Sequence, residues 1–540
     1  MSQAAKWGLP VFVIGMLFYW PMAHVLQHGL TGDWLQTLLE PLVLDAIWFT
    51  VWQAALSAVL CMAIGLPTAY VLYRRHSKHG RLLRALVTVP FALPTIVTAI
   101  GFTVFQNNDA AAATGLDALL GSPMFWIISA HVFVNFSVVV RTVGATWANL
   151  SHDTEEAAQL GGAGRFRIFW SVSRPQLNAA IVSSMATVFL YCTASYGLIL
   201  VLGGGMVNSI ETEIAYAANQ RLDLQEAGAL AIVQTLLSIG AFAISSTGKR
   251  SALGFEVQDS QAKQPKLDRR DWPAVMVASI ASLLVLAPLA LIVARAFLNI
   301  DGQATLDNFA DLGGRGARNL LNITIGQAAL NTLRNVVVAT ALATVIGVLV
   351  AYLLSRHNRN KRTRFMNTVL NIAFMMPLGV STIVLGFGYL LTFGTGWFAI
   401  RTSWVIVPLI QGLMAIPLVV RIVYPALVAI SEELGEQAST DGASQASAFF
   451  RIELPIVRES IGAAIGYAAI ISIGEFGAAS LLAYGSQATL PTVLYQLVSR
   501  PGGNNYGMAM AMSAIVIVLT FAVVFVASLP SKLRTAPQQK

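Results

Sequence analysis

The sequence is poor in charged residues. Of its 540 residues only 11% are Asp, Glu, Lys or Arg, whereas 56% are hydrophobic. A soluble globular chain carries about 25% charged residues, so this composition excludes an ordinary soluble domain, a disordered chain and a collagen-like chain. Because a membrane-spanning helix needs about 20 mostly apolar residues, the composition predicts a protein that lies mostly in a lipid bilayer.

Cysteine and the motifs of catalytic sites are also scarce. Only Cys61 and Cys192 occur, each inside a separate apolar run, which excludes a disulfide framework and a cysteine-based metal site. The chain has no G-x-x-x-x-G-K-[ST] loop for phosphate and no H-E-x-x-H pattern for zinc. We therefore expect no catalytic residues, no metal site and no cofactor in this chain. Basic cytoplasmic loops explain the net charge of +8, so no nucleic-acid partner is expected.

Apolar runs long enough to cross a bilayer recur along the chain. They lie near residues 8–27, 47–73, 82–105, 123–147, 177–202, 226–246, 273–297, 330–354, 365–393, 403–425, 457–483 and 506–529. Lys and Arg gather in alternate loops, such as 74–84 and 356–364, and in the polar stretch 245–271. Because basic loops stay in the cytoplasm, the sequence predicts twelve spans with both termini in the cytoplasm.

The two halves of the chain repeat each other. Residues pair at a separation of 282 early in the halves and of 280 later: Gly65 with Gly347, Arg74 with Arg356, Gly162 with Gly442, Pro175 with Pro455, and 209–212 with 489–492. Each half has six spans, so both halves have the same orientation, related by an axis along the membrane normal. We predict a first permease-like repeat at 1–246, a cytoplasmic linker at 247–271 and a second repeat at 272–540.

A long loop after the fourth span of each half carries a second pattern. The loop at 151–175 contains Glu156, Ala157, Ala158, Gly162 and Pro175, and the loop at 431–455 contains Glu436, Gln437, Ala438, Gly442, Leu454 and Pro455. Acidic residues are expected to begin a short helix and glycine to end it, before a second short helix that runs to the proline. The spacing resembles the EAA loop of ABC-importer permeases, which reads E-A-A, three residues, G, nine residues, I-x-L-P.

This resemblance implies a fold and a set of partners. The implied fold is the type I importer permease, all-α and polytopic, with twelve transmembrane helices in two parallel six-helix repeats in the bacterial cytoplasmic membrane. Each loop would dock on a separate ABC ATPase subunit, expected as a homodimer, which would bind the ATP and Mg. An extracytoplasmic solute-binding protein would deliver the solute. The chain would then be a transport subunit rather than an enzyme, and would work by alternating access.

The fifth and eleventh spans hold the candidate translocation residues. Glu475 and Phe476 fall opposite Ser195 and Tyr196 of the first half. A carboxylate within the membrane is costly unless it faces water or a partner, so Glu475 is expected either to attract a cationic solute or to hydrogen-bond neighbouring helix ends. Together with 202–205 and 489–491, these segments resemble the fused permeases of thiamine and ferric-iron importers. Thiamine is favoured over ferric iron.

An ion-gradient-driven secondary transporter with two parallel six-helix halves is the alternative. Such a carrier needs titratable residues at mid-membrane in several spans, whereas Glu475 is almost alone. It also gives no role to two matched EAA-like loops, so the importer is the favoured interpretation.

One stretch of small residues predicts close helix packing. Gly462-Ala463-Ala464-Ile465-Gly466 has glycines one helical turn apart. Small residues at that spacing let membrane helices approach closely. We therefore expect this face of the eleventh span to lie against another helix.

Overall fold

The computed structural model describes residues 3–75, 80–106, 120–246, 267–299, 301–356, 361–394, 403–430, 434, 437, 440, 442, 444–500, 502 and 504–528. Apart from one isolated antiparallel bridge between Leu298 and Ala304, these residues form helices and the turns that join them. The predicted all-α fold is therefore confirmed.

The first half contains thirteen described α-helices in two groups. Those up to the fourth span are α1 (Gln3–Ile14), α2 (Trp20–Gly29), α3 (Trp34–Leu38), α4 (Pro41–Ala69), α5 (Gly80–Ala92), α6 (Thr95–Gln106) and α9 (Pro123–Ala148). Those that follow are α10 (Asp153–Leu160), α11 (Arg165–Ile168), α12 (Arg174–Thr193), α13 (Tyr196–Gly203), α14 (Ile210–Tyr216) and α15 (Leu224–Ser246).

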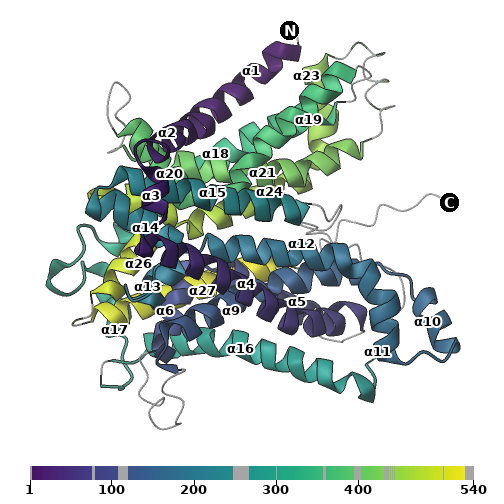
Figure 1. Ribbon diagram of the computed structural model, residues 1–540, viewed down its shortest axis with the longest axis horizontal. Coiled ribbons are helices and arrows are strands. Elements are labelled where there is room, and N and C mark those ends of the chain that lie inside the picture. Colours follow the sequence, from purple (N-terminus) through teal and green to yellow (C-terminus); the bar gives the residue numbers. More distant parts are fainter. Residues whose placement is uncertain are drawn as a thin grey trace.

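The second half repeats most of this order. Its first helices are α16 (Trp272–Ala296), α17 (Asp307–Ala310), α18 (Ile325–Ser355), α19 (Lys361–Met375), α20 (Thr382–Phe393) and α21 (Ile406–Val428). Its last are α23 (Gln445–Ala448), α24 (Leu454–Gly474), α25 (Gly477–Leu482), α26 (Leu490–Ser499) and α27 (Asn505–Ser528). Helices α10, α11 and α23 lie at one end of the molecule, which we call the coupling end, and α14, α17 and α26 lie at the opposite end (Figure 1).

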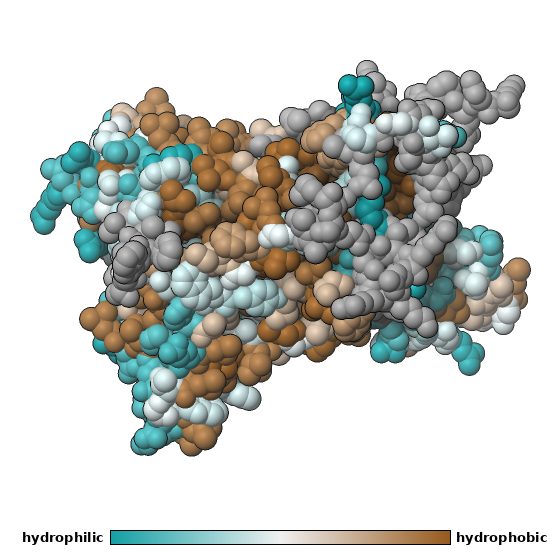
Figure 2. All heavy atoms as spheres, turned by 90° about the horizontal axis from the view of Figure 1, so that it is seen from above, coloured by the Kyte–Doolittle hydropathy of each residue, from teal (hydrophilic) through white to brown (hydrophobic). Residues whose placement is uncertain are grey.

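The number of spans agrees with the sequence. Among the described residues, ten helices are long and apolar enough to cross a membrane, and two bent pairs raise the number to twelve. The pairs bend by 106° between α5 and α6 and by 101° before α20, where Pro94 and Pro377 interrupt the helical backbone. Figure 2 shows hydrophobic side chains over the middle of the molecule and hydrophilic ones towards its two ends.

The predicted limits of the fifth and eleventh spans are wrong. Both helices begin earlier, at residues 165 and 449, and run through the proline of the loop rather than starting after it. A proline lacks the N–H that an α-turn needs, and a π-helical turn precedes each one, Phe169–Ser173 (η3) and Phe449–Glu453 (η9). Both long helices then end at residues 193 and 474, before the short helices α13 and α25.

Buried glutamines stabilise these two breaks. The carbonyls of the last helical turn have no helical partner, and an unpaired carbonyl within the membrane is costly. Three glutamine amides from neighbouring spans donate to them. The bonds are Gln53 Nε2 to Cys192 O at 3.0 Å, Gln234 Nε2 to Thr193 O at 3.1 Å and Gln411 Nε2 to Ser472 O at 3.2 Å.

The first helices of each half pack against the other half. The Tyr19 hydroxyl donates to the carbonyl of Ala373 at 3.2 Å, and Thr392 Oγ1 lies 3.1 Å from Nδ1 of His24. In the same way α16, which opens the second half, packs against α4 and α6 of the first. The two repeats therefore share one interface, although their sequence boundaries stay a prediction.

Matched glycines set the closest approach of helices within each half. A Cβ added to Gly65 would lie 2.8 Å from Cβ of Val139, and one added to Gly347 would lie 2.7 Å from Cβ of Val419. Real Cβ atoms do not approach this closely, so only glycine allows α4 to contact α9 and α18 to contact α21 in this way.

The glycines of α24 behave differently. Gly462 and Gly466 are exposed, and an added Cβ at either would meet no atom of the described residues within 4 Å. The expectation that the glycine face of this stretch lies against another helix is wrong, because that face points out of the bundle, whereas Ala464 between the glycines is buried.

These glycines give a matched stability prediction. Gly65→Ala and Gly347→Ala are each expected to destabilise the protein by about 1–3 kcal/mol, because overpacking displaces the neighbouring valine. Gly466→Ala should be neutral or stabilising by up to about 1 kcal/mol, because alanine favours the helix. Thermal unfolding midpoints of the detergent-purified variants measure both effects, and equal midpoints for Gly65→Ala and Gly466→Ala would contradict the packing argument.

Candidate coupling loops and translocation pathway

The loop at 151–175 forms a short helix with a defined end. Helix α10 carries Asp153, Glu155 and Glu156 in its first turn, where carboxylates are favourable to the helix dipole. It ends when the N–H of Ala163 donates to the carbonyl of Ala158 at 3.0 Å, with Gly162 at a φ of +79°. This pair of features is a Schellman end, and the left-handed conformation explains the glycine.

The matched glycine of the second loop has the same backbone conformation. Gly442 has a φ of +78°, close to that of its counterpart Gly162. Gln437 is helical and exposed, whereas Glu436 and Ala438 lie outside the described residues. Leu454 and Pro455 open α24, as Pro175 lies in the first turn of α12.

Helix α10 presents an apolar surface to the outside of the protein. Glu156 and Ala157 are exposed, and Ala158 is half-buried. Leu160 is 91% exposed and Phe166, on the neighbouring α11, is 78% exposed. Large apolar side chains together at the surface mark a contact site for another protein.

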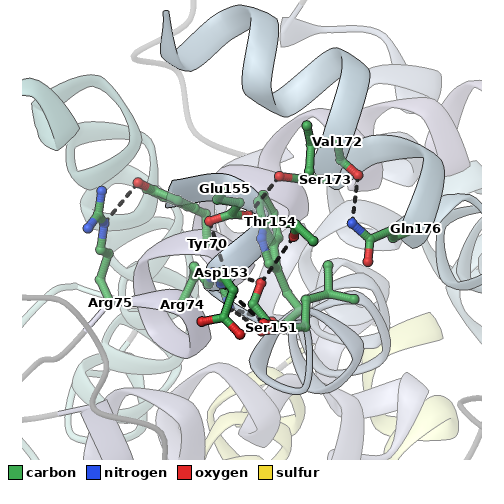
Figure 3. A network of polar contacts seen from close by, with 12 residues as sticks. Tyr70, Arg74, Arg75, Ser151, Asp153, Thr154, Glu155, Val172, Ser173 and Gln176 are labelled. Atoms are coloured by element: carbon green, nitrogen blue, oxygen red, sulfur yellow. Dashed lines mark hydrogen bonds and ion pairs between the residues drawn. The ribbon is translucent and has the colours of Figure 1, made fainter. Parts of the chain in front are cut away.

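A buried arginine attaches α10 to the membrane helices. Arg74, at the end of the second span, donates from Nη2 to Glu155 Oε2 at 2.8 Å and from Nη1 to the carbonyl of Leu150 at 2.8 Å. The hydroxyl of Ser173 donates to Glu155 Oε1 at 2.8 Å (Figure 3). The Arg74 side chain is only 3% exposed. Water therefore screens the attraction between Arg74 and Glu155 less than it would at the surface.

The second half makes the same attachment with the carboxylate in a different place. Arg356, the counterpart of Arg74, pairs with Glu453. Glu453 occupies the position that Ser173 occupies in the first half, whereas Gly435 stands where the first half has Glu155. Each loop thus supplies one carboxylate to the matched arginine of its own half, the first loop from near its start and the second from near its end. The sequence analysis paired the arginines but missed the carboxylates, because these do not align.

The end of the linker is joined to the first loop. The carboxylate of Asp271 pairs with Arg75 at 3.2 Å and with Arg165 of α11 at 2.7 Å, and accepts a hydrogen bond from the Tyr70 hydroxyl at 3.0 Å. Burial alone would raise the pKa of Asp271, but the backbone N–H of Asp268, Arg75 and these neighbours lower the pKa below its ordinary value. Asp271 is therefore ionised and fixes α16 to the first loop.

The two breaks bring the candidate pathway residues together at the interface of the halves. The rings of Tyr196 and Phe476 stack with centroids 5.4 Å apart and an interplanar angle of 23°. The Phe476 ring also contacts Tyr495 at 5.7 Å. Ser195 is 6% exposed, and its hydroxyl has no hydrogen-bond partner among the described residues. The stack joins the start of α13 to the start of α25.

The Glu475 side chain is hydrogen-bonded to the backbone of the helix that follows it. Its two carboxylate oxygens accept from the N–H groups of Ala478 at 2.7 Å and Ala479 at 3.2 Å, and the side chain of Thr382 faces it. Of the two roles expected for this residue, these contacts favour the one in which it stabilises a helix end. Glu211, which the sequence analysis did not select, is also buried at this interface, at 1% exposure. Its signal was a carboxylate in a segment whose counterpart, 489–492, has none.

Comparison with known proteins decides the family. A family model described as "Binding-protein-dependent transport system inner membrane component" matches residues 61–301 and 343–532. The chain belongs to this family. The two matches begin 282 positions apart, the separation found in the sequence repeat, so this binding-protein-dependent permease is a fusion of two family units. The ten to twelve candidate spans among its described residues and the duplicated match establish the type I permease fold and place it as an integral inner membrane transport subunit.

Individual relatives of this permease cover both halves. The chain is 27% identical over 501 residues to the thiamine transport system permease protein ThiP of Salmonella typhimurium, which covers 91% of this chain and 89% of the relative. It is 27% identical to ThiP of Brucella abortus over 89% of this chain and 86% of the relative. A probable sulfate transport system permease protein, cysT of Marchantia polymorpha, is 30% identical over 38% of this chain and 74% of its own length.

Proposed function

We propose that this chain is the permease of an ATP-driven importer that moves thiamine into the cytoplasm. The observation that carries the proposal is the similarity to thiamine permeases along nine-tenths of the chain, through both halves. Ferric iron, the second solute considered from the sequence, is not supported by the relatives described above. Family membership favours the importer over the secondary transporter.

The exposed apolar side chains of the first loop support the partners in this proposal. Leu160 and Phe166 would dock on one ATPase subunit, and the loop at 431–455 would dock on a second copy of it. ATP and Mg would bind to that homodimer, and this chain would bind neither. The basic loops favour an arrangement with the coupling end and both termini in the cytoplasm, so a solute-binding protein would contact the opposite end.

The arrangement at the breaks supports alternating access. Closing of the ATPase homodimer would move α10 and its counterpart, and the ion pairs of Arg74 and Arg356 would pass that motion to the spans. Because Tyr196 and Phe476 come from different halves, a rotation of one half against the other would separate their rings and open a path.

Reconstitution tests the proposed function. Proteoliposomes with this permease, its ATPase and its binding protein should accumulate radiolabelled thiamine with ATP and not with a non-hydrolysable ATP analogue. ATP-driven uptake of a ferric complex instead of thiamine would contradict the proposed solute. Thiamine uptake driven by an ion gradient in vesicles without the ATPase would contradict the proposed mechanism.

A further inference from the structure

Glu211 is a buried carboxylate without a counter-charge. It is 1% exposed, and no Lys, Arg or His among the described residues forms an ion pair with it. Its Oε1 has no hydrogen-bond partner in the part of the chain that the structure describes. The side chains of Ser381 and Gln234 face the carboxylate, but both are neutral. An ionised carboxylate in this position needs a cation.

The fold does not need a carboxylate at this position. Helix α14 begins with a capping box between Ser209 and Thr212, and α26 of the second half begins with the same box between Thr489 and Thr492. Position 211 corresponds to Pro491, so the same short helix forms with a proline there. Both helices are also anchored alike, by a threonine hydroxyl from the second span of each half that accepts a backbone N–H at 2.9 Å.

The helix that carries Glu211 packs in the region where the aromatic stack joins the halves. Helix α14, which carries Glu211, packs against α13, which begins at Tyr196, and against α20, which in turn packs against α25, the helix that follows Phe476. Ser381, which faces Glu211, is followed by Thr382, which faces Glu475. Glu475 accepts hydrogen bonds from two backbone N–H groups, whereas Oε1 of Glu211 has no hydrogen-bond partner among the described residues. Glu211, rather than Glu475, is therefore the carboxylate that is free to bind a cation.

We propose that Glu211, with the faces of Tyr196 and Phe476, is a binding subsite for a planar organic cation on the translocation path. The inference rests on the proposed function, because it adds a recognition site to the same path. When the halves separate, the unstacked rings offer two aromatic faces, which attract a cation by their π-electrons, and Glu211 supplies the negative charge. A thiazolium ring has the flat shape and the positive charge that this arrangement recognises.

Binding measurements test the subsite separately from transport. The probes are 3,4-dimethylthiazolium, a planar cation, and its neutral thiophene isostere, added to the purified permease–ATPase complex without binding protein. Saturation-transfer NMR should detect the cation on the wild type and on Glu211→Asp. Glu211→Gln should weaken cation binding at least tenfold and leave the isostere unchanged.

Two further variants keep the test decisive. Glu211→Pro removes the charge with the residue that the second half uses, so it should fold and lose cation binding as Glu211→Gln does. Glu40→Gln removes an exposed carboxylate and should leave cation binding unchanged.

The outcomes separate the two proposals. The subsite would be overturned if the wild type bound no cation. It would also be overturned if the wild type, Glu211→Gln and Glu211→Pro bound the cation equally. Glu211 would then be a protonated carboxyl or a packing residue. Glu211-dependent cation binding in a wild type that imports no thiamine would overturn the proposed solute and keep the subsite.

Discussion

Leu160→Glu is expected to abolish ATP-driven uptake. Leu160 is 91% exposed at the coupling end, and we propose that it is buried by the ATPase. The substitution loses the burial of a leucine, worth about 1.5–3 kcal/mol, and adds an unpaired charge to the interface. The affinity of the ATPase for the permease should fall on the order of 100-fold, measured by co-purification and by surface binding of the isolated ATPase.

The matched control for this variant is Leu306→Glu. Leu306 is 67% exposed and lies next to α17, at the opposite end of the molecule. It should leave ATPase binding unchanged, while both variants insert into the membrane normally. Wild-type co-purification of the ATPase with Leu160→Glu would show that α10 is not the docking helix.

Arg74→Ala is expected to have the second largest effect. Removing one partner of a buried ion pair costs about 3–5 kcal/mol, because the other charge stays without compensation, and α10 would lose its attachment to the second span. Thiamine uptake should fall at least tenfold, a loss of about 1.4 kcal/mol or more of coupling. Uptake rates and the thermal unfolding midpoint report the two effects separately.

The second half supplies a rescue for this attachment. Glu155→Gln should weaken uptake, and the double variant Glu155→Gln/Ser173→Glu should restore it, because it places the carboxylate where Glu453 stands opposite Arg356. If the double variant is no better than Glu155→Gln alone, the two attachments are not equivalent.

Local chemistry made much of the loops predictable. The acidic first turn of α10 and the glycine at its end follow from the helix dipole and from the left-handed conformation of Gly162. The course of the chain near Pro175 was not predictable, because a π-helical turn absorbs the missing N–H and the helix continues.

The sequence by itself determined the class of this protein. Twelve apolar runs, the duplication and the EAA-like loops are local or periodic features, and hydrophobicity and spacing are enough to read them. The sequence also placed Glu475 within the membrane, because its neighbours in the chain form an apolar run long enough to cross a bilayer.

Only the tertiary structure decided which buried groups are compensated. The Glu475 carboxylate accepts from nearby backbone N–H groups, whereas Oε1 of Glu211 has no partner among the described residues. Arg74 and Arg356 pair with carboxylates at unmatched positions. The exposure of Gly466 and the contact of Tyr196 with Phe476 are likewise set by how helices from distant segments meet. The physical reason is that hydrogen bonds and ion pairs depend on distances of a few ångströms between segments, and a linear pattern does not specify them.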